Sequence, residues 1–316
     1  MNILVSDPIG QSGLEYLKKC GYAVTYNPTI TAEDLEKEIS KFDALIVRSR
    51  TRVTEKLLEK AKNLKVIARS GAGVDTIDIA SAVRHNIVVV NAPGANAEAV
   101  AEHALALMLA LARDLVQTST KMAGGDWPKS SYRGMELKGK TVGVVGFGSI
   151  GARVTELCSA FGMNVLVFTK TVSEDRKKHV ASLHATLVDL QTLVKESDMI
   201  TLHVSLTEQT RGLFSASLLS QMKPISYLIN TSRGAIVDES ALTNALSNGS
   251  LAGAALDVFE SEPLPQTSIL RSLPNIILTP HVAANSKESE ERASILIADD
   301  IDRVLQGKPA LRRVTL

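Results

Sequence analysis

The segment from Thr141 to Gly151, TVGVVGFGSIG, constrains the fold of this chain more than any other stretch. An apolar run precedes three glycines in G-x-G-x-x-G spacing, and the pattern of residues 152–161 predicts a helix after them. A strand, a glycine turn and a helix in this order favour dinucleotide binding, because the glycines permit a tight turn and a close approach of the backbone to a pyrophosphate. The helix N-terminus adds free N–H groups for the phosphates. The residues of this turn expected to bind a dinucleotide are Gly146, Gly148, Ser149, Ile150 and Gly151.

The length of 316 residues and a hydrophobic content of 45% suffice for about two domains, each with its own core. A net charge of +1 gives no reason to expect a nucleic acid or a membrane surface as a partner. The two cysteines, Cys20 and Cys158, lie far apart and indicate neither a metal site nor a disulfide framework. The chain shows no signal-peptide pattern and no apolar run long enough to span a bilayer, so we expect a cytoplasmic protein.

Short β-branched runs alternate with amphipathic helical patterns through residues 1–90, which predicts a parallel, doubly wound α/β sheet. Thr31, three residues before Asp34, is expected to cap one of these helices. This part of the chain lacks a glycine fingerprint, so we do not expect it to hold the dinucleotide. Its expected strands are 2–6, 23–26, 44–48, 65–69 and 87–91, and its expected helices include 11–19, 32–40 and 54–61.

After a turn at 91–94, the Ala- and Leu-rich residues 97–116 predict one long helix, buried at a domain junction or a subunit interface. Glu102 and His103 within it are interpreted as structural, and 124–134 as a loop. From Thr141 onward strands and helices alternate again. A last helix is expected over 287–305, with Asn285 and Ser286 as its capping pair. The expected strands of this second sheet are 141–145, 164–168, 199–203, 227–230, 251–256 and 275–278.

Several motifs, in one order along the chain, resemble those of the D-2-hydroxyacid dehydrogenases, in the branch that contains phosphoglycerate and hydroxypyruvate/glyoxylate reductases. The resemblance covers essentially the whole chain. The motifs that carry it are VRSRT at 47–51, SGAGVD at 70–75, NAPGANAEAVAEHALALMLALAR at 91–113, GFGSIG at 146–151, INTSRGAIVDESAL at 229–242, AALDVFESEP at 254–263 and LTPHVAA at 278–284.

This resemblance implies two doubly wound parallel-sheet domains with the active site in the cleft between them. A flavodoxin-like substrate domain would comprise residues 1–96 and 285–316, and a Rossmann cofactor domain would comprise residues 97–284. The resemblance also implies a homodimer, with the helix over 97–116 as the candidate contact. We do not expect the regulatory extension of longer phosphoglycerate dehydrogenases after Leu316, nor feedback inhibition by serine through it.

The implied activity is hydride transfer between a nicotinamide cofactor and C2 of a D-2-hydroxy acid or 2-keto acid, such as hydroxypyruvate, glyoxylate or a phosphoglycerate-like substrate. In this pattern His281 protonates the nascent alkoxide, Glu262 pairs with and orients His281, and Arg233 binds the substrate carboxylate. These residue types suit the chemistry, because a histidine exchanges protons near neutral pH and a guanidinium binds a carboxylate in a bidentate manner. The pattern also implies cofactor contacts for His203, Thr231 and Asp257.

Two loops, at 48–50 and 70–75, follow strands directly, and ligands of open α/β sheets lie at the carboxyl ends of strands. By themselves these loops fit a ligand site and a solvated Arg pair with an ordinary Gly turn equally well. By resemblance, the backbone amides of Ala72 and Gly73 take the substrate carboxylate, with Ser49 and Arg50 nearby. Arg48 and Arg50 could serve a second anionic group, such as a phosphate, or could equally face outward. No metal is expected.

The chain departs from the usual pattern where the strand over 164–168 ends. About 20 residues past the first glycine, enzymes that use NAD normally carry an acidic residue for the adenine ribose hydroxyls. Here Thr169, Lys170 and Thr171 follow the strand. A carboxylate would repel a 2′-phosphate, whereas Thr and Lys can bind one. We therefore expect Thr169 and Lys170 to contact the cofactor and hypothesise NADP(H) rather than NAD; the alternative is that Lys170 is solvated and the ribose is held in some other way.

Two further interpretations share this fold. A nucleotide-sensing binding protein, similar to the corepressors that resemble this family, would keep the catalytic residues and add partner-binding segments, of which none is evident. A formate dehydrogenase would carry Gln at the position of Glu262, so Glu262 argues against that activity.

Overall fold

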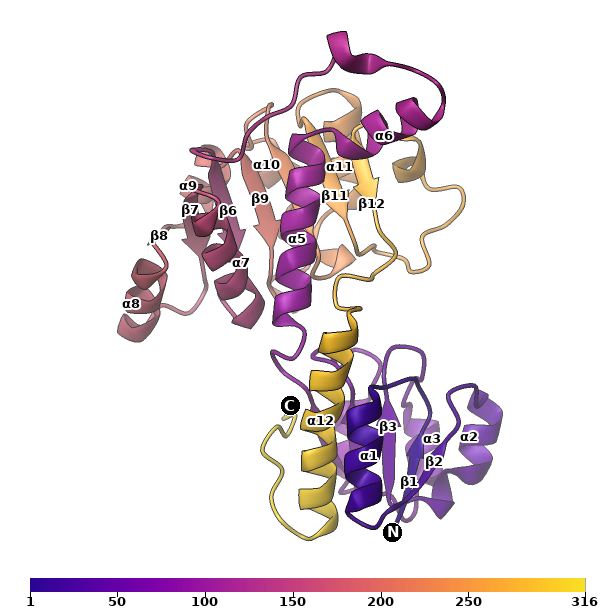
Figure 1. Cartoon of the computed structure of the whole chain (residues 1–316). Coiled ribbons are helices and arrows are strands. Elements are labelled where there is room, and N and C mark those ends of the chain that lie inside the picture. The colour runs from indigo at the N-terminus through magenta and orange to yellow at the C-terminus, as the bar shows by residue number, and fades with distance from the viewer. Residues whose placement is uncertain (316) are drawn as a thin grey trace. The chain divides into compact units, whose positions relative to one another are not determined.

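The computed structural model describes residues 1–315 and divides into two compact units, shown in Figure 1. Unit 1 is Met1–Asn96 with Asn285–Leu316, and unit 2 is Ala97–Ala284. Each unit contains one sheet whose neighbouring strands all run parallel, with helices packed on both of its faces. The predicted fold class, an α/β chain with two doubly wound parallel sheets, is confirmed.

The sheet of unit 1 has five strands in the order β2-β1-β3-β4-β5. Its strands are β1 (Asn2–Val5), β2 (Ala23–Tyr26), β3 (Ala44–Val47), β4 (Val66–Arg69) and β5 (Val88–Asn91). Its helices are α1 (Gln11–Lys19), α2 (Ala32–Glu38), α3 (Glu55–Lys60), α4 (Ile79–Arg84) and α12 (Lys287–Leu305). Every strand predicted for residues 1–90 is present, with ends that differ from the prediction by at most one residue.

Alternate residues of each strand in unit 1 point to opposite faces of the sheet. Ile3 and Ile46 pack against α1 and α12, whereas Leu4 and Leu45 pack against the helices α2, α3 and α4. Because both faces are covered, the strands β1, β3, β4 and β5 are mostly apolar and largely buried, whereas the edge strand β2 is mostly exposed. This arrangement leaves the loops at the carboxyl ends of the strands free for function.

The C-terminal helix α12 returns to the sheet formed by the N-terminal residues and packs against α1, as Figure 1 shows. The two helices approach closely at Gly13, where a Cβ atom would lie 2.6 Å from the backbone oxygen of Ser294. Ser286 caps α12 by accepting a hydrogen bond from the backbone N–H of Ser289 at 3.1 Å. The cap predicted at Thr31 is also confirmed, since its side chain accepts from the N–H of Asp34 at 3.1 Å.

The sheet of unit 2 has seven strands in the order β12-β11-β10-β9-β6-β7-β8. Its strands are β6 (Thr141–Val145), β7 (Asn164–Phe168), β8 (Ala185–Leu187), β9 (Met199–Leu202), β10 (Tyr227–Asn230), β11 (Gly253–Leu256) and β12 (Ile276–Leu278). Its helices are α5 (Ala97–Ala112), α6 (Leu115–Ala123), α7 (Ser149–Ala160), α8 (Glu174–Ser182), α9 (Leu190–Glu196), α10 (Ala216–Leu219) and α11 (Glu239–Ser247). The edge strand β8 was not predicted, because three residues are too few to show an alternating pattern.

Two apolar clusters cover the faces of this second sheet. On one face α5, α7 and α8 pack against alternate residues such as Val144 and Val167. On the other face α9, α10 and α11 pack against residues such as Ile200 and Leu228. The central strand β6 is therefore enclosed on both sides, and the glycine turn that follows it is held in a fixed position.

The prediction of one helix over residues 97–116 is wrong. Helix α5 ends at Ala112, and Asp114 has a φ of 44°, in the left-handed region that ends a helix. A second helix, α6, then begins at Leu115. An aspartate adopts this conformation more readily than most residues, because a short polar side chain can hydrogen-bond locally. The apolar pattern continues across the break, so periodicity alone did not show it.

Within residues 1–315, no helix has both the length and the apolar character that are needed to cross a membrane.

Candidate active site

The glycine turn after β6 has the geometry of a phosphate cradle. Gly146 has a φ of 103°, and a Cβ atom on Gly151 would lie 2.0 Å from the backbone oxygen of Gly146. By contrast, a Cβ atom on Gly148 would meet nothing within 4 Å. Helix α7 begins directly after Gly148, and its N-terminal N–H groups receive no side-chain cap. Two glycines are therefore required for the turn itself, while the space beside Gly148 is open for a ligand.

Two buried polar atoms at the same edge of the sheet have no hydrogen-bond partner among the described residues. They are Nδ1 of His203, after β9, and Oγ1 of Thr231, after β10. Burial lowers the pKa of His203 to about 3, so its ring is neutral near pH 7. Buried polar atoms are rarely left without partners, and a polar ligand at the strand ends would supply them. The open cradle and these two atoms fit a nicotinamide dinucleotide.

The loop after β10 carries Arg233 and is shaped by Asn230. The side-chain amide of Asn230 donates to the backbone oxygen of Arg233 at 2.9 Å, and its side-chain oxygen accepts from the N–H of Ser232 at 3.0 Å. At Gly234 a Cβ atom would lie 1.9 Å from the backbone carbon of Phe259. Only glycine permits this approach, which brings the Arg233 loop against the segment that carries Glu262.

Glu262 and His281 form a hydrogen-bonded pair. Nδ1 of His281 lies 2.7 Å from Oε2 of Glu262, and Oε1 of Glu262 accepts from the N–H of Phe259 at 3.0 Å. The carboxylate is thus held by its own loop, and it fixes the orientation of the imidazole. With a proton on Nδ1 directed at Glu262, Nε2 is the ring atom that remains for a substrate. Both side chains are partly exposed, as proton transfer to an exchanging substrate requires.

The buried carboxylate of Asp257 determines where His281 lies. It accepts hydrogen bonds from Oγ1 of Thr279 at 2.6 Å, from the N–H of Val282 at 2.9 Å and from the N–H of Ala283 at 2.8 Å. The backbone oxygen of Asp257 accepts from the N–H of His281 at 2.8 Å. His281 itself has a φ of 54°, a conformation that these surrounding bonds maintain. The contact of Asp257 with a nicotinamide carboxamide stays a prediction.

Three residues of this region were not predicted to belong to the site. Thr279 joins Asp257 to His103, whose Nε2 lies 3.2 Å from Oγ1 of Thr279. His103 therefore has a structural partner, in agreement with its interpretation, but that partner adjoins the catalytic turn. Glu239 accepts a hydrogen bond from the N–H of Glu260, and burial, with the charges of Glu260 and Glu262, raises its pKa. At the start of a helix such an acid is usually interpreted as balancing the helix dipole, so no sequence signal pointed to this contact.

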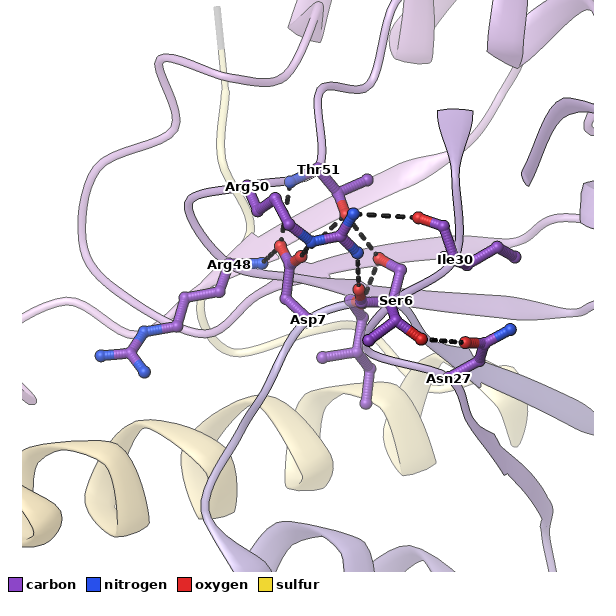
Figure 2. Close-up of polar contacts among 9 residues, drawn as sticks. Ser6, Asp7, Asn27, Ile30, Arg48, Arg50 and Thr51 are labelled. Atoms are coloured by element: carbon purple, nitrogen blue, oxygen red, sulfur yellow. Dashed lines mark hydrogen bonds and ion pairs between the residues drawn. The ribbon is translucent and has the colours of Figure 1, made fainter. Parts of the chain in front are cut away.

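In unit 1, the buried carboxylate of Asp7 organises the loop that contains Ser49 and Arg50, as Figure 2 shows. It accepts from the N–H of Arg48 at 2.5 Å and from the N–H of Thr51 at 3.1 Å. The Nε atom of Arg50 lies 3.1 Å from Oδ1 of Asp7. Nη1 of Arg50 donates to the backbone oxygen of Ile30 at 2.9 Å, and Nη2 donates to that of Ser6.

The two arginines of this loop are therefore both engaged. All three nitrogens of the Arg50 guanidinium have protein partners, so Arg50 ties together the loops that follow β1, β2 and β3. The Arg48 side chain points away from this cluster in Figure 2 and bonds to Glu290 and Asn285, at the start of α12. A substrate contact of Ser49 or Arg50 stays a prediction.

The loop with Ala72 and Gly73 lies at the carboxyl end of β4. The side-chain amide of Asn91 donates to the backbone oxygen of Ala72 at 2.6 Å, and the N–H of Ala92 donates to the oxygen of Gly71 at 3.0 Å. These bonds use carbonyl groups of the loop. Its N–H groups at Ala72 and Gly73 have no acceptor within residues 1–315, as an anion-binding loop requires.

At the end of β7, the side chains of Thr169 and Lys170 have polar partners and no carboxylate neighbour among the described hydrogen bonds. Oγ1 of Thr169 accepts from Nη1 of Arg176 at 3.4 Å, and Nζ of Lys170 donates to Oε1 of Gln209. No group of three or more His, Cys, Asp or Glu side chains suited to a metal ion is found in the described part of the chain.

Comparisons with known proteins agree with this geometry. The family model of the D-isomer specific 2-hydroxyacid dehydrogenases, NAD binding domain, matches residues 105–283. The chain is 42% identical over 316 residues to a D-3-phosphoglycerate dehydrogenase of Archaeoglobus fulgidus, a match that covers 100% of this chain and 59% of that protein. It is 40% identical to a hydroxypyruvate reductase of Thermotoga maritima, over 95% of this chain and 97% of that protein.

A crystal structure of a protein from Thermus thermophilus is similar over 100% of both chains, with a TM-score of 0.90 and 34% identity. The chain spans a little over half the length of the phosphoglycerate dehydrogenases that it matches. The family model covers most of unit 2, including the glycine turn and the Glu262–His281 pair. This chain belongs to the D-isomer specific 2-hydroxyacid dehydrogenase family.

Proposed function

We propose that this protein transfers a hydride between a nicotinamide coenzyme and C2 of a D-2-hydroxy acid or 2-keto acid. The observation that carries the proposal is the Glu262–His281 pair, fixed by Asp257 in the same unit as the glycine turn. A bound nicotinamide supplies or accepts the hydride. A pair of this kind holds and moves a proton, which is the other half of the reaction that interconverts a carbonyl and an alcohol.

In the direction of reduction, Nε2 of His281 gives its proton to the nascent alkoxide, and Glu262 stabilises the charged ring and keeps its orientation. Arg233 binds the substrate carboxylate and polarises the adjacent carbonyl group. In unit 1, the free N–H groups of Ala72 and Gly73 are proposed to bind substrate, with Ser49 and Arg50 as further contacts. The substrates that fit these roles are small 2-keto acids such as hydroxypyruvate and glyoxylate, or a phosphoglycerate-like acid.

The coenzyme is proposed to lie on the cradle after β6. Gly148, Ser149 and Ile150 bind the pyrophosphate through the backbone at the start of α7, where the space is open. Gly146 and Gly151 shape the turn. His203, Thr231 and Asp257 contact the nicotinamide half, and Thr169 and Lys170 contact the adenosine half. The missing acid after β7 favours NADP(H) over NAD(H).

The test is coenzyme oxidation by the purified protein with NADH and with NADPH, against glyoxylate, hydroxypyruvate, phosphohydroxypyruvate and longer 2-keto acids. We expect turnover on at least one acid, and loss of about 100-fold or more in kcat for His281→Gln. The matched control is His85→Gln, an exposed histidine at the C-terminal end of α4 in unit 1. Binding of a coenzyme without turnover on any acid, or an equally active His281→Gln enzyme, contradicts the proposal.

We also propose a homodimer. Several large apolar side chains on and beside α6 are exposed: Leu115 is 59% exposed, Val116 48% and Trp127 73%. A patch of this kind favours association with another protein surface, and a second copy of the chain is the simplest occupant. Sedimentation of the intact protein is expected to give twice the mass of the chain, and Trp127→Ser with Leu115→Ser to shift it toward the monomer. A monomeric wild-type protein contradicts the dimer.

A further inference from the structure

Two basic side chains meet the turn that follows β7 in unit 2. Lys170 lies in the turn itself, and Arg176 comes from the first turn of α8, whose cap is Ser173. Nη1 of Arg176 donates to the backbone oxygen of Thr171 at 2.9 Å and lies 3.4 Å from Oγ1 of Thr169. These bonds bring the guanidinium back over the turn. Arg176 thus lies near Thr169 in space, although it is seven residues further along the chain.

Neither cation is neutralised by an ion pair with another residue in the described range 1–315. Among the described residues, no carboxylate forms a salt bridge with Lys170 or Arg176. The neighbouring acid Glu174 pairs instead with Lys177, at 2.8 Å. Lys170 bonds to an uncharged amide oxygen, that of Gln209. The turn therefore carries two positive charges that can bind an anion without first breaking an ion pair.

The location of this turn indicates which part of a nucleotide would reach it. Strand β7 pairs with β6 so that Phe168 faces Val145, and the N–H of Gly146 donates to the oxygen of Phe168 at 2.8 Å. The turn that starts at Thr169 therefore lies beside the glycine cradle. When the pyrophosphate of a dinucleotide lies on such a cradle, the adenine ribose lies at the end of the next strand. Its 2′ position is the group that this turn would contact.

We infer that Arg176, together with Lys170, binds the 2′-phosphate of NADP(H) and selects this coenzyme over NAD(H). The inference deepens the proposed function and rests on it. The planar guanidinium can bind two phosphate oxygens at once, and Thr169 can donate its hydroxyl to a third. Sequence reasoning reached Thr169 and Lys170 but not Arg176, because a side chain in the following helix is brought back only by the local fold.

The experiment compares the binding of 2′,5′-ADP and 5′-ADP to the intact protein by calorimetry, without a substrate. We expect 2′,5′-ADP to bind at least about tenfold more tightly than 5′-ADP, because one charge-assisted hydrogen bond contributes about this factor to the affinity. Arg176→Ala should weaken 2′,5′-ADP about tenfold and leave 5′-ADP within about twofold. Lys177→Ala, on the same helix and exposed, is the matched control and should change neither affinity.

The two ligands together distinguish recognition of the 2′-phosphate by Arg176 from mere support of the turn, and a second variant tests the recognition separately. If Arg176 only supported the turn, Arg176→Ala would weaken both ligands equally, which would overturn the inference. Thr169→Asp, which places an acid at the strand end, should reverse the preference toward 5′-ADP. Equal binding of the two ligands by the wild-type protein also overturns it. Equal binding of the two ligands would still leave the proposed function intact if the protein reduces keto acids with NADH and with NADPH. If neither 2′,5′-ADP nor 5′-ADP binds, both the inference and the proposed function are refuted.

Discussion

The Nε atom of Arg50 lies 3.1 Å from the buried carboxylate of Asp7, and the same guanidinium reaches the backbone oxygens of Ile30 and Ser6. One side chain thereby connects three loops at the carboxyl edge of unit 1. A lysine at this position would keep the charge but cannot extend donors in three fixed directions.

We expect Arg50→Lys to lower the free energy of unfolding by about 1–2 kcal/mol, through the loss of the bonds to the two carbonyl groups. The measurement is urea denaturation, with Arg52→Lys, an exposed neighbour, as the control. An unchanged midpoint in Arg50→Lys would show that the two carbonyl bonds contribute nothing to stability.

Asp257→Asn should damage both stability and catalysis. An asparagine presents an NH2 group where one carboxylate oxygen now accepts an N–H from Val282 or Ala283, so one of these bonds is lost. The expected cost in the free energy of unfolding is about 1–3 kcal/mol, and kcat should fall because the turn with His281 is no longer held. Affinity for 5′-ADP should remain, since the proposed adenosine site is at the end of β7. Asp189→Asn, an exposed cap of α9 that asparagine also satisfies, is the control for stability.

Glu262→Gln preserves the size of the side chain and removes its charge. The hydrogen bond to Nδ1 of His281 can persist, but the charged imidazole loses its counter-ion. We expect kcat for reduction to fall about 10- to 100-fold while the affinity for coenzyme changes little. A variant that loses coenzyme binding in proportion to kcat would assign Glu262 a structural role instead.

Two glycines of the cradle, Gly148 and Gly151, should respond differently to alanine. Gly151→Ala places a Cβ atom 2.0 Å from the Gly146 oxygen, so it should destabilise the fold by several kcal/mol. Gly148→Ala meets nothing within 4 Å and should leave the thermal midpoint nearly unchanged, yet it should weaken coenzyme binding because the methyl group occupies the ligand's space. Equal coenzyme affinity in Gly148→Ala and wild type would place the pyrophosphate away from this turn.

His203 should make the protein less stable in mild acid. Its pKa is lowered to about 3 by burial in the folded state, while the unfolded chain has the ordinary value of about 6.5. Between these values the unfolded state binds one more proton, so the free energy of unfolding falls as the pH falls. Between pH 7.5 and 5.5 the wild type should lose about 1.4 kcal/mol relative to His203→Gln. Denaturant titrations of both proteins at the two pH values measure this difference; a constant gap would show that His203 protonates in the folded state.

Local patterns were sufficient to predict most strands and the sites of several caps. Buried apolar residues recur every second residue in a strand and about every 3.6 residues in a helix, so short stretches of sequence reveal them. The break at Asp114 escaped this method, since the apolar pattern runs through it and only one backbone conformation changes. Residues whose contacts depend on how the loops fold also escaped it. Arg176 and Glu239 reach the turns at Thr171 and Glu260 only in the folded chain. Likewise the bonds of Asp257 to Val282 and Ala283 join positions on either side of β12.

The strand order of unit 2 places β7 on one side of β6 and places β9, β10, β11 and β12 on the other. The residues assigned to the 2′-phosphate come from the β7 side, and Arg233, Glu262 and His281 all come from the other. If these residues select the coenzyme as proposed, substitutions confined to residues 169–176 would exchange one pyridine nucleotide for another and leave the residues of proton transfer unchanged. Selection could then change the coenzyme that the enzyme uses without changing the carbonyl substrate that it reduces.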